Sequence, residues 1–155
     1  MPAAVAAVAM LVASAAAATE PPCRLELSEQ RTGAVLAQLP LPPRQPQFAI
    51  AFEHSVLGHT VIDRYELRGE RAHLIEERFS GEGYGLPHAA APGERLGRNG
   101  DAWTLALDRI VDPLVVRPLR DQRMRLRIGE RELLLADLTA RPVPILIRPL
   151  GCDRS

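Results

Sequence analysis

The stretch FAIAFEHSVLGHTVIDRYELRGERAHLIEERFS, residues 48–80, decides the fold. Apolar and polar side chains alternate along it, which is the period of a β-strand with one face in a core. A turn signal at residues 68–70 separates two of the alternating runs. Three strand faces follow from the alternation: Phe48, Ile50, Phe52 and His54; Val61, Asp63, Tyr65 and Leu67; and His73, Ile75, Glu77 and Phe79.

The same alternation continues on both sides of this stretch, and no helical pattern is evident after residue 20. The 14 prolines and 11 glycines divide the chain into short runs, as in a sandwich or barrel. Further alternating runs occur near residues 23–27, 103–107, 123–128, 133–135 and 143–147. We therefore expect residues 19–155 to form a single all-β domain, an antiparallel sandwich or barrel of about nine or ten short strands.

The first residues predict export. Residues 2–18 carry no charge, and Ala16, Ala17 and Ala18 fit the small-residue pattern of a signal-peptide cleavage site. The basic residues that usually precede such an apolar run are missing. We expect residues 1–18 to be a cleaved signal peptide, with an uncleaved membrane anchor as the alternative. The domain would then be periplasmic, or anchored in the inner membrane and facing the periplasm.

The chain has only two cysteines, Cys23 and Cys152, at the two ends of the expected mature domain. In an oxidising compartment a disulfide between them would join the first and last strands. The alternative is two unpaired thiols.

Charge and composition argue against nucleic acid as a partner. Nineteen basic residues balance nineteen acidic ones, so no net field attracts a polyanion or an acidic membrane. Aromatic residues make up 4% of the chain, which leaves few rings on which bases could stack.

No catalytic constellation stands out, so we expect no enzyme. His54 and Ser55 are adjacent, as a base and a nucleophile might be, but neighbouring residues on a strand point to opposite faces. No Gly-x-Ser-x-Gly elbow surrounds Ser55. A hydrolase that uses His54 is a remote alternative. We expect no metal or cofactor, because the four histidines show no recognised ligand spacing: His54, His59, His73 and His88.

Two features suggest a binding module as a further alternative. Glycines at 81, 83 and 85 open the longest expected loop, 81–101, and could cradle an anion with backbone N–H groups, although a tight bend from strand to loop is the favoured explanation. Arg123, Arg125 and Arg127 would form one positive strand face, which could meet an acidic partner or simply be solvated.

Three motifs in order resemble the bacterial family named domain of unknown function 1850. They are Phe-x-Ile-x-Phe-x-His-Ser-Val at 48–56, Val-x-Asp-x-Tyr at 61–65, and Glu-x-Phe-Ser-x-x-Gly-Tyr-Gly-Leu-Pro at 77–87. Two positions depart from the family pattern: Thr60 stands where Pro is usual, and Asp63 where Glu is usual.

The resemblance implies a setting and no reaction. Members look like small exported or membrane-attached proteins encoded beside TAXI-type TRAP transporters. An accessory role in solute uptake follows as an expectation, with the TRAP permease or the TAXI solute receptor as partner. The motifs also suggest a shared surface or structural knot in which His54 or Ser55 contacts Asp63: His54, Ser55, Asp63, Tyr65, Glu77, Gly83, Gly85 and Pro87.

Overall fold

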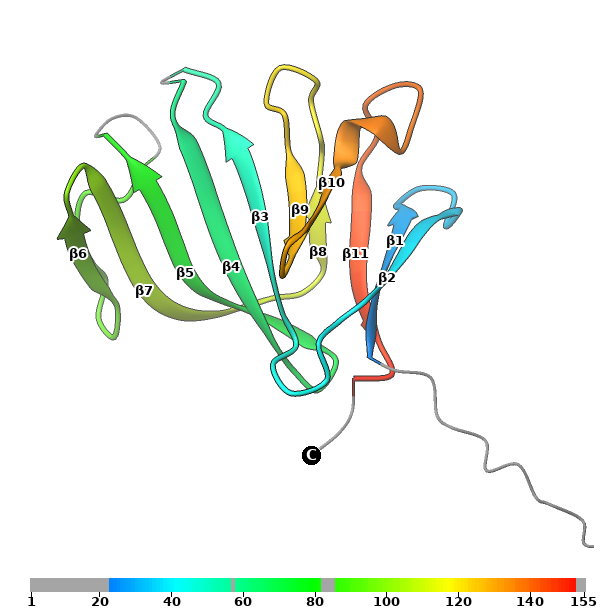
Figure 1. The fold of residues 1–155 in the computed structure, drawn as a ribbon, viewed down its shortest axis with the longest axis horizontal. Helices are drawn as coiled ribbons and strands as arrows, with labels where there is room; N and C mark the ends of the chain where they lie inside the picture. The colour runs from blue at the N-terminus through cyan, green and yellow to red at the C-terminus, as the bar shows by residue number, and fades with distance from the viewer. Residues whose placement is uncertain (1–22, 57, 82–85, 153–155) are drawn as a thin grey trace, which may run out of the picture.

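The computed structural model describes residues 23–56, 58–81 and 86–152, and the expected export segment at 1–18 lies outside them. Over these ranges the chain forms two antiparallel sheets and one short 3-10 helix, η1 (Leu135–Asp137) (Figure 1). The two sheets pack on a shared core and do not close into a barrel. The prediction of an all-β sandwich is therefore confirmed.

The smaller sheet has four strands in the order β2-β1-β11-β8. Its members come from both ends of the chain: β1 (Arg24–Glu29), β2 (Val35–Pro40), β8 (Leu114–Val116) and β11 (Ile145–Leu150). A disulfide joins Cys23 to Cys152 beside the β1–β11 pair, with 4.4 Å between their Cα atoms. The first and last described residues are thus held together at one edge of the molecule.

The larger sheet has seven strands in the order β10-β9-β3-β4-β5-β7-β6. Its centre is the stretch 48–80, which forms two consecutive antiparallel pairings, β3 with β4 and β4 with β5. The strands are β3 (Gln47–Glu53), β4 (Thr60–Arg68), β5 (Arg71–Ser80), β6 (Arg95–Asn99), β7 (Ala102–Val111), β9 (Arg125–Ile128) and β10 (Arg131–Leu134).

The main core lies between the two sheets. Leu25 and Ile145 of the smaller sheet are fully buried with Ile50 and Leu126 of the larger one, each at most 2% exposed. In Figure 1, β6 and β7 lie at the end of the molecule opposite β1 and β2. The inner face of the larger sheet therefore extends beyond the smaller sheet.

A bulge in β5 changes which residues face inward. Arg64 pairs with Glu76 but Tyr65 pairs with Leu74, so Ile75 is an extra residue that shifts the register. Leu74 is buried in the core, while His73 lies on the outer face. The predicted face of His73, Ile75, Glu77 and Phe79 is therefore wrong in its first half and correct for Glu77 and Phe79.

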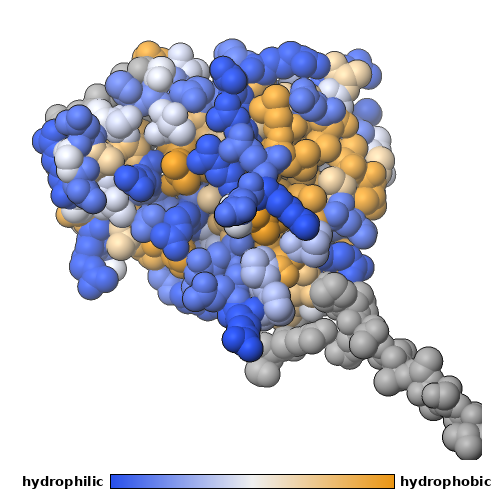
Figure 2. Space-filling view, in the orientation of Figure 1, coloured by the Kyte–Doolittle hydropathy of each residue, from blue (hydrophilic) through white to orange (hydrophobic). Residues whose placement is uncertain are grey.

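On the face of the molecule that Figure 2 shows, apolar residues gather on one side. Figure 2 shows apolar residues gathered on the side where β1, β2 and β10 lie, and polar residues over much of the β6–β7 end. A depression between the edge strands β2 and β10 is lined by Leu39, Pro40 and Leu133. Within the described ranges, no helix is long and apolar enough to cross a membrane.

Candidate functional site

Two carboxylates face each other across the inner surface of the larger sheet. Asp63 on β4 is the direct antiparallel partner of Glu77 on β5. Directly opposed residues have Cβ atoms about 4.5–5.5 Å apart, close enough for their charges to interact strongly. Like charges placed this way destabilise a sheet. The pair therefore lowers the stability of the fold, so its presence calls for a reason other than stability.

The carboxylate pair separates two apolar clusters on the same face. On one side is the main core, which begins with Tyr65 on β4 and Leu74 on β5. On the other side Val61 and Phe79 pack with Leu86, which the loop after β5 brings over the sheet. The two acidic side chains thus interrupt an otherwise continuous hydrophobic surface.

An open groove of about 690 Å³ lies over this interruption. Its apolar walls include Phe52, Val61, Phe79 and Leu86, and its polar members include both carboxylates of the pair. The remaining lining residues are His54, Pro87, His88, Ala89, Glu94, Leu105 and Arg109. A volume of this size falls within the range of about 300–1,000 Å³ typical of small-molecule sites.

The groove perturbs the acidity of its own groups. Burial, assisted by the charge of Glu77, raises the pKa of Asp63 to about 7. Burial also raises the pKa of Glu77. The positive charge of Arg109 partly opposes this rise, and the negative charge of Glu94 adds to it. Burial likewise raises the pKa of the Tyr65 hydroxyl, and the charges of Asp63 and Glu77 raise it further. Around neutral pH the Asp63 carboxyl is therefore divided between its protonated and ionised forms.

The arginine nearest the pair is bound elsewhere. Arg109 projects from β7 to the groove and donates from Nη2 to Glu94 Oε1 at 3.0 Å. Glu94 Oε2 in turn accepts the backbone N–H of Ala91 at 3.1 Å. Neither Asp63 nor Glu77 has a hydrogen-bond or ion-pair partner among the described residues.

Four of the eight residues predicted for the site line this groove: His54, Asp63, Glu77 and Pro87. Tyr65 lies next to Asp63 on the same strand face, buried and stacked on Phe48 with ring centroids 5.0 Å apart. Ser55 is exposed in the turn after β3 and does not line the groove. Gly83 and Gly85 lie outside the described residues.

His54 is held by the turn that joins β3 to β4. Its backbone N–H donates to the carbonyl of His59 at 2.8 Å, and its carbonyl accepts the N–H of Gly58 at 2.9 Å. Its Nδ1 accepts the N–H of Val56 at 3.4 Å. The turn thus fixes the backbone of His54 at the rim of the groove. Direct contact between His54 and Asp63 stays a prediction.

Sequence reasoning missed Glu94 and Arg109 as members of the site. They come from the segment before β6 and from β7, and the pairing of these two strands brings them together. Neither belongs to a recognisable motif, so only the strand register could have identified them.

Gly81 is pressed against an imidazole ring at the end of β5. Its φ is +81°, and a Cβ added there would meet the ring of His59 at 2.9 Å. An L-residue at this position would suffer both backbone strain and a clash. This explains at least one glycine of the loop by close packing.

We expect Gly81→Ala to lower the free energy of unfolding by about 1–3 kcal/mol, measured by urea unfolding. Gly93→Ala is the matched control, because Gly93 also has a positive φ (+88°) but open space around its Cβ position. The Gly81 variant should be the more destabilised of the two. Equal losses would mean that the His59 contact contributes nothing.

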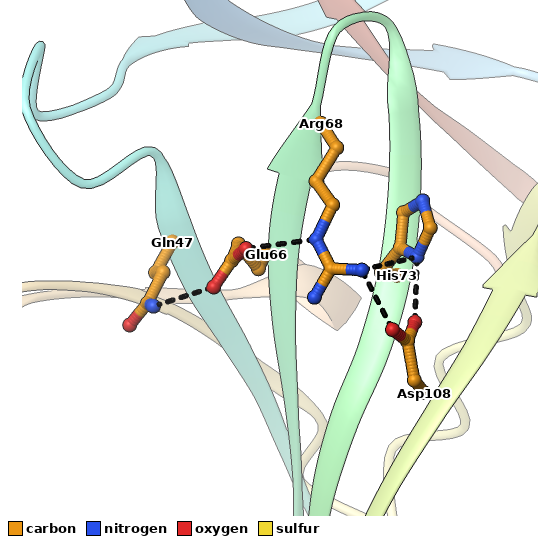
Figure 3. Close-up of polar contacts among 5 residues, drawn as sticks. All are labelled: Gln47, Glu66, Arg68, His73 and Asp108. Atoms are coloured by element: carbon orange, nitrogen blue, oxygen red, sulfur yellow. Dashed lines mark hydrogen bonds and ion pairs between the residues drawn. The ribbon is translucent and has the colours of Figure 1, made fainter.

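A second polar cluster, on the outer face of the same sheet, has a different character (Figure 3). Arg68 at its centre donates to Glu66 at 2.9 Å and to Asp108 at 2.6 Å. Asp108 also contacts His73 Nδ1 at 2.7 Å, and Gln47 donates to Glu66 at 3.2 Å. Hydrogen bonds from His73 and Arg68 lower the pKa of Asp108. Here each carboxylate has hydrogen-bond partners, so the cluster is a connected network of side chains.

The predicted arginine face is shorter than expected. Arg125 and Arg127 lie side by side on β9 and both bind Glu132, at 3.2 and 2.8 Å. Arg123 precedes the strand with a φ of +47° and leaves the alternation. In the part of the chain that the structure describes, no group of three or more His, Cys, Asp or Glu side chains could hold a metal ion.

Comparison with known proteins gives one match. Residues 48–135, more than half of the chain, match a family model described as Domain of unknown function (DUF1850). The matched segment runs from the second residue of β3 past the end of β10, and it contains the whole groove. No curated protein and no solved structure matches the chain.

Proposed function

Because this chain belongs to the domain-of-unknown-function 1850 family, we propose that it is an exported accessory protein of a TAXI-type TRAP uptake system, with the groove between β4 and β5 as its ligand-binding site. In this role it binds and does not catalyse. The TRAP permease or the TAXI solute receptor is the partner that it serves in the periplasm.

The observation that supports a binding role is the convergence of the motif residues. His54, Asp63, Glu77 and Pro87 come from separate segments, yet all four line one groove. If these four motif residues served packing alone, we would expect them in the hydrophobic core, where Phe48 and Leu126 lie. Polar motif residues around a ligand-sized groove instead favour a shared recognition surface.

The same geometry favours binding over hydrolysis. A hydrolase of the Ser–His type needs the hydroxyl within hydrogen-bond reach of the imidazole and beside the bound substrate. His54 lines the groove while Ser55 is exposed in the turn outside it. The groove also holds three carboxylates against one arginine, which argues against the anion-binding alternative.

Co-purification tests the partner. The tagged full-length chain is expressed in its native host, membranes are solubilised gently, and captured proteins are identified by mass spectrometry. We expect enrichment of a TRAP permease or TAXI receptor over an unrelated exported protein carrying the same tag. Recovery of neither, with the tagged chain itself recovered in good yield, would contradict the accessory role.

A further inference from the structure

The two carboxylates of the groove differ from the other acidic groups paired on the sheets. On the outer face Glu76 binds Arg64 at 3.1 Å, and Asp108 binds Arg68 at 2.6 Å. On the smaller sheet the buried Glu26 binds Arg148 at 2.6 Å. Asp63 and Glu77 are partly buried but have no such partner among the described residues.

This lack of a partner is notable because arginine is abundant. All 19 basic residues of the chain are arginine, yet the one on the groove, Arg109, binds Glu94. A half-buried carboxylate without an ion-pair partner is unfavourable, and a second carboxylate directly opposite makes it more so. A positive group placed between Asp63 and Glu77 would relieve both costs.

We infer that the groove binds an organic cation, a primary ammonium carried on an apolar alkyl or aryl body, with the charge between Asp63 and Glu77 and the body against the apolar side chains that line the groove. This inference rests on the proposed role of the groove as a ligand site. It adds the chemical class of the ligand.

The walls of the groove select an organic cation over a metal ion. His54, His88 and Glu94 also line the groove, yet among the described residues no group of three or more His, Cys, Asp or Glu side chains could hold a metal ion. Metal ions such as Ca²⁺ need about six or more oxygen ligands, many of them from protein. An ammonium needs only a few acceptors, and the two carboxylates supply them. The remaining volume accommodates an apolar body.

Binding of such a cation depends on pH through Asp63. The ammonium favours the ionised carboxylate, so binding displaces the proton that the raised pKa of about 7 retains. We expect affinity to weaken by about tenfold per pH unit below that value and to level off above it. The other charged or titratable groups that line the groove or border its floor are His54, Tyr65, Glu77, His88, Glu94 and Arg109.

Thermal-shift and calorimetric titrations of the full chain test the inference. Three amines serve as probes: n-butylamine, cadaverine and 2-phenylethylamine. The neutral 2-phenylethanol and the anionic 3-phenylpropionate match the last in shape but not in charge. Asp63→Asn and Glu77→Gln remove the charges with little change in shape. Glu76→Gln is the matched control, because Glu76 is adjacent in sequence but lies on the outer face with Arg64.

We expect at least one amine to raise the Tm of the wild-type chain and of Glu76→Gln, with an affinity at least about tenfold weaker in each groove variant. Equal or tighter binding of the alcohol or the acid would overturn the cationic class while leaving the groove as a ligand site. Absence of a shift with all three amines, or an amine shift that both groove variants retain, would also overturn the inference. Co-purification of a TRAP component is a separate readout, so failure of the accessory role is distinguishable.

Discussion

Reduction of the Cys23–Cys152 disulfide should lower the free energy of unfolding by about 4–5 kcal/mol. The two cysteines are separated by 129 positions, so the bond restricts nearly the whole unfolded domain. In the chain-entropy model a loop of this length gives close to the largest stabilisation that a single disulfide provides. Urea unfolding with and without a phosphine reductant measures the difference.

The double variant Cys23→Ser/Cys152→Ser is the control for this experiment. It should match the reduced wild-type chain in stability and should not respond to the reductant. The bond also fixes the end of the β1–β11 pair, where Arg24 lies opposite Leu150, so this end of the two strands should fray first when the bond is absent. A loss of less than about 1 kcal/mol would contradict the entropic argument.

Replacing Asp63 by Asn should stabilise the protein at about pH 8 and have little effect near pH 4. The folded-state pKa of Asp63 is raised to about 7 from an ordinary 3.8, so the folded chain holds a proton that the unfolded chain releases. The contribution of Asp63 to stability is therefore full below about pH 4 and is lost as the pH rises to about 7. The amide of the variant cannot ionise, so the variant avoids this loss.

The gain above pH 7 should be about 2–4 kcal/mol, reduced from the full linkage value because the groove is partly open to solvent. Urea unfolding of both proteins at several pH values measures it, and the difference between them is the informative quantity. Asp108→Asn is a contrasting control, since the pKa of Asp108 is lowered and its loss should destabilise the chain at neutral pH. A wild-type chain more stable than Asp63→Asn at pH 8 would contradict our account of the groove.

With the inferred ligand, Asp63 lowers the stability of the fold above pH 7 and strengthens the binding of the amine. The same substitution is expected to stabilise the fold and to weaken amine binding. Carboxylates retained at a cost to the fold are typical of recognition sites, where local rules of strand pairing give way to function. On the outer face, by contrast, Glu66 and Asp108 both accept hydrogen bonds from Arg68.

Much of the fold could be predicted from the alternation of side chains. The inward faces expected for β3 and β4 agree with the structure, because burial on one side of a strand imposes a period of two. The face expected for β5 is wrong before Glu77, because the extra residue Ile75 reverses the alternation and nothing in the local sequence marks it. Short strands such as β8 lack enough residues to show any period.

The site was predictable only in part. The motifs identified His54, Asp63, Glu77 and Pro87, but strand reasoning could not show that Glu77 stands opposite Asp63. That juxtaposition depends on register, which a bulge one step away alters. The ion pair between Arg109 and Glu94 depends in the same way on the pairing of β6 with β7.

The position of the disulfide has a consequence for how the molecule is presented to its surroundings. Cys23 and Cys152 lie at one end of the strands, whereas the turn after β3 and the end of β5, which border the groove, lie at the other (Figure 1). A tether attached ahead of Cys23 would therefore hold the domain with the groove at the end directed away from the point of attachment. Pulling on that tether would load the disulfide-linked pair of terminal strands first, at the end of the molecule opposite the groove.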